Sequence, residues 1–380
     1  MFSEQIATGL ILFFILYGIT AVVPLMAAVY LLLRRGNAFA PDVTPSLRLR
    51  RWAAAFFFVA FLGHVWWLLF YIYSLDLHSV AYVLVAVLDC VTLLTTIAGT
   101  LLAMLQDRKR PIWPAFAAMI PFIAFGVLQI LYPDGTFMHI ATIYILTFYV
   151  LFSVYMVFAV HQYGRWLNDN YADLENKKVW LSQVVSLACL LLFILYALVD
   201  ADTILIYVLH IVELVLFALL LWRVETLPQL DSIPEVQENC PPAPETLQEN
   251  DTPASALPSV VASLIEQQLV EHCEDTQLYL EHDLTLQQLA QAVRTNRTYL
   301  SLYFSSHETT YNAYINDLRI NHFMKLYRKA ITTQQSVTAQ QLAIDSGYRS
   351  YSTFSLAFKQ RMGQSVTAWM RATGGDMPTA

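Results

Sequence analysis

Two short stretches of the chain combine cationic, hydroxyl and amide side chains at helical spacing. They contain Asn296, Arg297, Thr298 and Ser301 in the first stretch, and Ser350, Ser352, Thr353 and Lys359 in the second. Residues three and four positions apart share one face of a helix, so each stretch predicts a compact polar face. Such side chains hydrogen-bond to base edges and pair with phosphates in a DNA major groove. The chemistry that they indicate is recognition of double-stranded DNA.

The elements that must position these residues occur twice. The sequence LTLQQLA at 284–290 returns as VTAQQLA at 337–343, an offset of 53 residues. Thr285 and Thr338 begin the two copies, and threonine hydroxyls cap helices well where apolar residues then recur at helical spacing. Each copy therefore predicts a short helix, a tight turn and a second, exposed helix. The chain contains a duplicated helix-turn-helix unit.

The two turns differ in their chemistry. Gly347 closes the first helix of the second copy, where glycine adopts the left-handed conformation at little cost. Arg294 stands at the corresponding place in the first copy, and a positive φ there costs about 1 kcal/mol. The first turn is expected to be either strained or differently shaped.

The second copy resembles the AraC/XylS-type transcriptional regulators. The matching residues are Gly347, Tyr348, Phe354, Phe358, Lys359, Gly363, Trp369 and Arg371. The resemblance implies two helix-turn-helix units, at about 284–305 and 337–359, joined by a long helix at about 311–329. In that family the two units enter successive major-groove segments on one side of the duplex. Val366 departs from the family pattern, because proline usually stands there, and Glu308 lies in a turn that commonly carries glycine.

We assign the DNA contacts to the two exposed helices. The candidates for base edges are Arg297, Thr298, Ser301, Ser352, Thr353 and Leu356. The candidates for phosphates are Asn296, Ser350 and Lys359. Leu302 and Leu356 stand where several relatives have polar residues, so these two contact thymine methyl groups or nothing. A solvated face is the alternative for each residue alone, but duplication of the scaffold favours DNA for the pair of helices.

The rest of the chain is very apolar. Of its 380 residues, 57% are hydrophobic and only 13% are charged, well below the roughly 25% of soluble domains. Apolar runs long enough to cross a bilayer lie at 6–33, 52–75, 80–105, 111–132, 139–163, 179–199 and 203–224. The sequence predicts seven transmembrane helices in a domain of residues 1–225, and the first run is expected to be a retained span rather than a signal peptide.

The orientation follows from the loop charges. All twelve Lys and Arg residues of this part lie in the first, third and fifth loops or at the end of the last span. Cytoplasmic loops carry such an excess, so we expect a bacterial inner-membrane protein with its N-terminus outside and its C-terminus in the cytoplasm.

Residues 226–258 are acidic and rich in proline, which predicts a disordered linker. Residues 284–371 hold ten Lys and Arg against three Asp and Glu, a net charge of +7, as phosphate binding requires.

Four ionisable residues fall at depth within the expected spans: His64, Asp89, His210 and Glu213. Neutral groups hydrogen-bonded inside the bundle are one interpretation. The other is a polar pocket for a small molecule or a proton.

These observations define an all-α protein: a seven-helix transmembrane bundle, an acidic linker, and a double helix-turn-helix domain at 259–375. The expected function is a membrane-embedded transcription regulator whose partners are promoter DNA and the bilayer. RNA polymerase and a second copy of the chain are further candidate partners. The chain shows no nucleophile elbow or phosphate loop, so an enzyme is not expected, and no cofactor or metal is predicted. A transporter or small-molecule receptor with a regulatory helical domain is the alternative.

Overall fold

The computed structural model describes residues 2–73, 80–174, 177–181, 183–184, 187–188, 191, 203–230 and 259–374. Within these ranges the chain is helical and forms no strand, which confirms the predicted all-α class. It divides into two compact units. Unit 1 comprises Met1–Tyr163 and Asn176–Asp231, and unit 2 comprises Gly164–Glu175 and Ser232–Ala380.

Unit 1 is built from long apolar helices. They are α1 (Phe2–Leu33), α2 (Leu47–Ile72), α3 (Val80–Met104), α4 (Trp113–Ala117), α5 (Ile120–Leu131), α6 (Thr136–Asn170), whose last turns belong to unit 2, and α8 (Thr203–Thr226). Six stretches of the described residues are long and apolar enough to span a bilayer. The expected span at 179–199 and the expected linker at 226–258 lie largely outside the described residues, which include only 226–230 of the linker. The count of seven spans therefore stays a prediction.

The expected fourth span, 111–132, is divided into two helices. α4 ends at Ala117 and α5 begins at Ile120, and each has a proline, Pro114 or Pro121, in its first turn. Proline has no N–H and is tolerated in a first turn, where that donor has no helical partner. The stretch Trp113–Leu131 is still long and apolar enough to span a bilayer, as expected, and the helix break lies just before Pro121.

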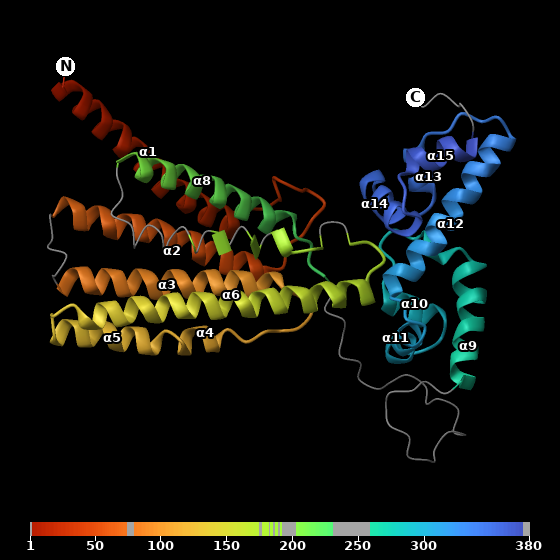
Figure 1. Ribbon diagram of the computed structural model, residues 1–380, viewed down its shortest axis with the longest axis horizontal. Helices are drawn as coiled ribbons and strands as arrows, with labels where there is room; N and C mark the ends of the chain where they lie inside the picture. Colours follow the sequence, from red (N-terminus) through yellow and green to blue (C-terminus); the bar gives the residue numbers. More distant parts are fainter. Residues whose placement is uncertain are drawn as a thin grey trace, which may run out of the picture. The chain divides into compact units, whose positions relative to one another are not determined.

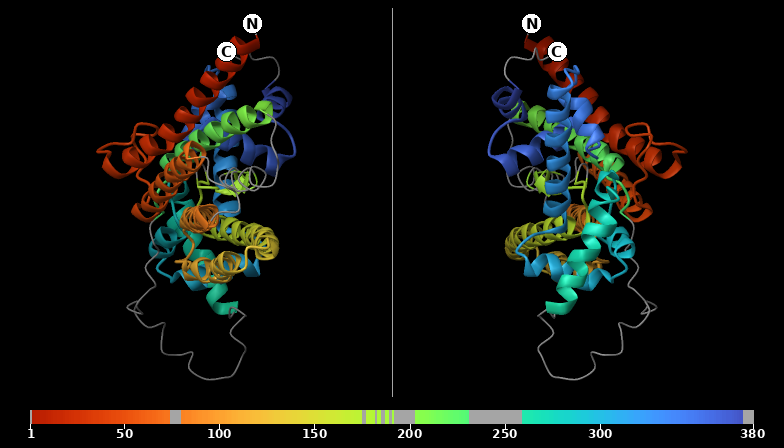
Figure 2. Two further views of the ribbon diagram at one scale, coloured as in Figure 1. Left: turned by 90° about the vertical axis from the view of Figure 1, so that its left-hand side faces the viewer. Right: turned by 90° about the vertical axis from the view of Figure 1, so that its right-hand side faces the viewer.

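Helices of unit 1 pack side by side. α1 contacts α2 and α8, and α2 also contacts α3 (Figure 1, Figure 2). At the α2–α3 contact Gly99 leaves room for the Trp52 ring, since a Cβ at Gly99 would lie 2.2 Å from it. Small residues permit such close approach between membrane helices.

Unit 2 contains the duplicated scaffold. Its elements are α9 (Ser259–Leu269), the π-helical turn η2 (Val270–Glu274), the 3₁₀ turn η3 (Leu278–Leu280), α10 (Leu286–Ala292), α11 (Arg297–Ser306), α12 (Tyr311–Thr332), α13 (Ala339–Asp345), α14 (Tyr351–Met362) and α15 (Val366–Gly374). Thr285 caps α10 and Thr338 caps α13, as predicted. Their hydroxyls accept hydrogen bonds from the N–H groups of Gln288 (3.2 Å) and Gln341 (3.1 Å).

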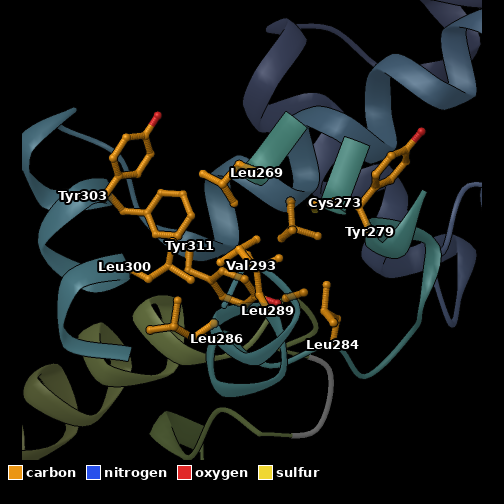
Figure 3. Packing of buried hydrophobic residues seen from close by; sticks show 14 of the residues in the cluster. Leu269, Cys273, Tyr279, Leu284, Leu286, Leu289, Val293, Leu300, Tyr303 and Tyr311 are labelled. Carbon is orange, nitrogen blue, oxygen red and sulfur yellow. The ribbon is translucent and has the colours of Figure 1, made fainter. Parts of the chain in front are cut away.

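The joining helix α12 carries one core at each end. Its N-terminal half packs with α9, α10 and α11 around Leu289, Leu300 and Ile315, and Figure 3 shows buried side chains of this cluster pointing toward one another. Its C-terminal half packs with α13, α14 and α15 around Phe323 and Phe358. Figure 1 shows α10 and α11 near one end of α12, and α13, α14 and α15 near the other. The predicted joining helix is confirmed, with three further residues at its end.

Arg319 lies inside the domain at the middle of α12. It is 1% exposed, and its guanidinium donates hydrogen bonds to the carbonyls of Tyr279 (2.7 Å) and Glu281 (2.5 Å). The guanidinium also lies 5.5 Å from the centre of the Tyr348 ring. Arg319 was counted among the cations available to phosphate, but its burial removes it from the surface that DNA would meet.

Gly347 and Gly363 provide a matched test of the second turn. Both have a positive φ, 87° and 69°, so alanine costs about 1 kcal/mol at each. At Gly347 a Cβ would also lie 2.8 Å from the Leu280 backbone, whereas nothing lies within 4 Å at Gly363. We therefore expect Gly347→Ala to lower the local unfolding free energy of unit 2 by about 1–3 kcal/mol more than Gly363→Ala. Hydrogen exchange of the α13 and α14 amides in the full-length chain measures it, and equal protection in both variants would contradict the close packing.

Candidate nucleic-acid interface and intramembrane polar cluster

In the first helix-turn-helix copy, the exposed helix is α11, which is held in place by three buried residues. Leu300, Tyr303 and Phe304 enter the first core, so the helix can present only its opposite face. Thr298 on that face is exposed, and Ser301 is half-buried. Leu302, also half-buried, lies four residues after Thr298, which places an apolar group on the same face.

In the second helix-turn-helix copy, the exposed helix is α14, which has the corresponding arrangement. Phe354 and Phe358 are buried, and Ser352, Leu356 and Lys359 are exposed at spacings of four and three residues. Leu356 is 53% exposed, a large apolar side chain without a place in the core. Hydroxyl, apolar and cationic groups thus follow one another along one face, which is the mixture that meets base edges and phosphates.

Two of the predicted phosphate contacts cap the exposed helices. Asn296 caps α11, where its side-chain oxygen accepts a hydrogen bond from the Tyr299 N–H at 2.7 Å. Ser350 caps α14, and its hydroxyl accepts from the Thr353 N–H at 3.3 Å and lies 3.0 Å from the Thr353 hydroxyl. These residues place a helix N-terminus, which itself favours anions, at the start of each exposed face.

Arg297 is engaged inside unit 2 rather than free on the surface. Its Nε and Nη2 both donate to the side-chain oxygen of Asn170, at 3.0 and 2.6 Å. The side chain is half-buried, and this burial lowers the pKa of Arg297, although an arginine stays charged. The expectation that α11 exposes Arg297 was wrong for this conformation, because residue 170 at the end of α6 covers it.

The segment at 164–175 is part of the same compact unit as the duplicated scaffold. Ala172 is buried in the first core, and its N–H donates to the Leu284 carbonyl at 3.3 Å. The Asn312 side chain donates to the carbonyls of Tyr171 (3.0 Å) and Ala172 (2.7 Å). This contact could not be predicted from local sequence patterns, because its partners lie more than a hundred residues apart.

Two exposed cations flank α14 and were not assigned from the sequence. Arg349 precedes the helix and pairs with Asp283 at 3.3 Å, while Arg361 in its last turn pairs with Asp317 at 2.7 Å. All four side chains are at least a third exposed, so these ion pairs exchange readily with other partners. The positive net charge of 284–371 was the signal that could have pointed to them.

The comparisons with known proteins agree with this geometry. Residues 289–372 match the family model described as a helix-turn-helix domain. This region is an AraC-type helix-turn-helix domain. No curated protein matches the chain, and no solved structure matches it. The match covers α11 to α14 in full, so it includes both exposed helices.

The polar residues predicted at depth in unit 1 come together from three helices. His64 of α2 and His210 of α8 both face Glu213 of α8, with their nearest ring nitrogens 3.6 and 3.5 Å from the same carboxylate oxygen. Asp89 of α3 is buried beside them. Its carboxylate accepts a hydrogen bond from the Trp67 indole at 3.1 Å and lies against Gly63, the residue before His64.

The DNA contacts assigned to α11 and α14 predict a DNA-binding phenotype for a double variant. Arg297→Ala with Lys359→Ala removes one cation from each helix, so we expect promoter affinity to fall about 10- to 100-fold at moderate salt. Quantitative footprinting on the bound promoter measures it. Lys325→Ala with Arg328→Ala, which removes two exposed charges from α12, is the charge-matched control and should cost less. Equal losses in both variants would show a nonspecific charge effect instead.

Proposed function

We propose that this protein is a membrane-embedded transcription regulator that binds specific DNA sequences and responds to a signal received by its membrane unit. The observation that carries the proposal is the presence, on one chain, of a double helix-turn-helix domain and of six helices apolar enough to span a bilayer. A regulatory DNA-binding domain accounts for the C-terminal unit without any catalytic group.

The length of α12 supports binding to two successive major-groove segments. With 22 residues, α12 is about 33 Å long. The two exposed helices pack on cores at its opposite ends. One turn of B-DNA advances about 34 Å, so a joining helix of this length suits two groove segments on one side of the duplex.

The charge of the loops supports a location in a bacterial inner membrane with the C-terminal unit in the cytoplasm. Arg34, Arg108 and Arg165 represent the three loops that hold the basic residues, and those loops face the side of the negative leaflet. The same orientation places residues 164–175 in the cytoplasm, where unit 2 must lie to reach DNA.

The contact between Asn170 and Arg297 supports a route for regulation. α6 is one continuous helix that ends at Asn170, so displacement of its end would release Arg297. We infer an equilibrium between a form in which Asn170 holds Arg297 and a form in which DNA does. Association of two copies would raise the local concentration of DNA-binding units further, and recruitment of RNA polymerase would follow from promoter binding.

Transport is a second candidate function. The proline-divided pair α4 and α5 is the observation that favours it, because interrupted helices line pathways in many transporters. Transport alone leaves the helix-turn-helix domain without a role. Loss of substrate uptake in a deletion strain, with unchanged transcription, would favour transport over regulation.

Mapping of chromosomal binding sites tests the proposed function. We expect the full-length chain to occupy a small set of promoters through a common sequence motif. Residues 259–380 expressed alone should occupy the same motif without any response to signal, because Asn170 is absent. Full-length protein that crosslinks to no chromosomal site, or whose C-terminus lies outside the cytoplasm in a reporter fusion, would overturn the proposal.

A single side chain tests the regulatory contact. Asn170→Ala removes the acceptor of both Arg297 hydrogen bonds, so DNA affinity should rise about tenfold in the full-length chain. Asn168→Ala is the control, because Asn168 donates to the Gly164 carbonyl of its own helix. Quantitative binding to the mapped promoter in detergent measures both. An affinity of the Asn170 variant equal to that of the control would show that the contact does not compete with DNA.

A further inference from the structure

The cluster of His64, His210 and Glu213 has the spacing of metal ligands. The two nitrogen–oxygen distances of 3.6 and 3.5 Å are long for hydrogen bonds, which favour 2.7 to 3.2 Å. Ligands bound about 2.0–2.1 Å from a tetrahedral zinc ion lie about 3.4 Å from one another. One ligand atom from each residue falls within 4.8 Å of the other two. The three donor atoms therefore outline one side of a tetrahedral site.

The hydrogen bond made by His64 fixes which of its nitrogens is available. Its Nδ1 lies 2.9 Å from the Ala60 carbonyl, an acceptor only, so Nδ1 carries the proton and donates it. In the neutral ring, Nε2 then turns a lone pair toward the Glu213 carboxylate. Two acceptors that face each other need either a second proton on the imidazole or a metal ion between them. A backbone carbonyl that orients a histidine in this way is typical of metal-ligating imidazoles.

The apolar surroundings disfavour a negative charge at this cluster that no cation compensates. The Tyr17 ring packs against both imidazoles, with centroids 5.3 and 5.5 Å away, and Phe13 packs against His210 at 6.1 Å. The spans that supply the cluster have no Lys or Arg over 52–72, 80–104 and 203–222. Two carboxylates, Glu213 and Asp89, thus lie among apolar spans whose own sequence supplies no fixed positive charge.

We propose that His64 Nε2, His210 Nδ1 and the Glu213 carboxylate bind one divalent transition metal ion of the zinc class. Two imidazoles and one carboxylate suit zinc or cobalt, whereas magnesium and calcium favour oxygen ligands alone. A fourth position remains for water or an exchangeable ligand. Asp89 is a positioning residue that adds negative charge beside the site. The proposal departs from the sequence expectation of no metal, because His64 joins the i, i+3 pair of α8 only through tertiary packing. A role for this metal ion as the signal that the membrane unit receives rests on the proposed function.

Binding of Co²⁺ and Zn²⁺ to the purified full-length chain in detergent tests the site independently of DNA. We expect one metal ion per chain and a Co²⁺ visible spectrum of a four-coordinate nitrogen and oxygen site. Glu213→Gln, which is nearly isosteric, and His64→Ala should each lower Zn²⁺ affinity at least tenfold. His161→Ala, an exposed histidine of α6, is the matched control and should bind as the native chain does. A monodisperse Glu213→Gln protein with native Co²⁺ spectrum and Zn²⁺ affinity would overturn the proposal.

Promoter occupancy separates failure of this proposal from failure of the proposed function. We expect addition of Zn²⁺ or of a chelator to change occupancy by the native chain several-fold, and Glu213→Gln to abolish the change. An occupancy that follows pH but not metal, with no Zn²⁺ bound, would overturn the metal site and leave a proton-responsive regulator. Metal bound at the cluster of a chain that occupies no promoter would uphold the site and overturn the regulatory function.

Discussion

The buried guanidinium of Arg319 is the interaction on which the geometry of the DNA-binding unit depends. A cation removed from water is stable only when its donors are satisfied, and here two carbonyls of the segment before α10 accept them. Tyr348, which follows the turn of the second copy, covers the same guanidinium. One side chain in the middle of α12 therefore connects the first core to the second, and burial lowers its pKa without removing its charge. Gly347 leaves the space that this arrangement needs, since a Cβ there would lie 3.1 Å from the Arg319 Nε.

The contacts of Arg319 hold the two helix-turn-helix copies together as one rigid domain. A helix of seven residues, such as α10 or α13, is too short to be stable alone, so each must be held by packing. α12 supplies that packing at both ends and fixes the separation of α11 and α14 by its length. Aromatic residues make the junctions, with Phe304 beside Tyr314 (5.2 Å between centroids) and Phe323 beside Phe354 (4.4 Å). The proposed binding to two groove segments benefits from this rigidity, because freedom between α11 and α14 would be lost on binding.

Local features of this unit could be predicted from the sequence, and tertiary features could not. The caps at Thr285 and Thr338, the joining helix and the unusual turn at Arg294, whose φ is 54°, follow from the chemistry of neighbouring residues. Burial of Arg319 was missed, because its partners lie about 40 residues away and its spacing on α12 resembles that of a surface cation. The cover over Arg297 was missed for the same reason, since Asn170 is 127 residues away. In unit 1 His64, Asp89, His210 and Glu213 could be predicted from their depth as one candidate pocket, but the approach of both imidazoles to one Glu213 oxygen follows only from the packing of α2 against α8.

The hydrogen bonds between Asn170 and Arg297 also limit the size of the proposed regulatory effect on DNA affinity. A good bidentate contact between arginine and guanine discriminates by about 1–3 kcal/mol, so release of this one side chain changes affinity by roughly 5- to 150-fold. Asn170 must be displaced for that gain, and the hydrogen bonds that it loses reduce the net effect. A regulator that needs a wider range of DNA affinity must combine the release of Arg297 with a second change. Pairing of two DNA-binding domains is one such change, because it multiplies the affinities of the two domains. The proposed release of Arg297 therefore suits graded adjustment of DNA affinity, and under the same proposal an all-or-none response would require a second copy of the chain.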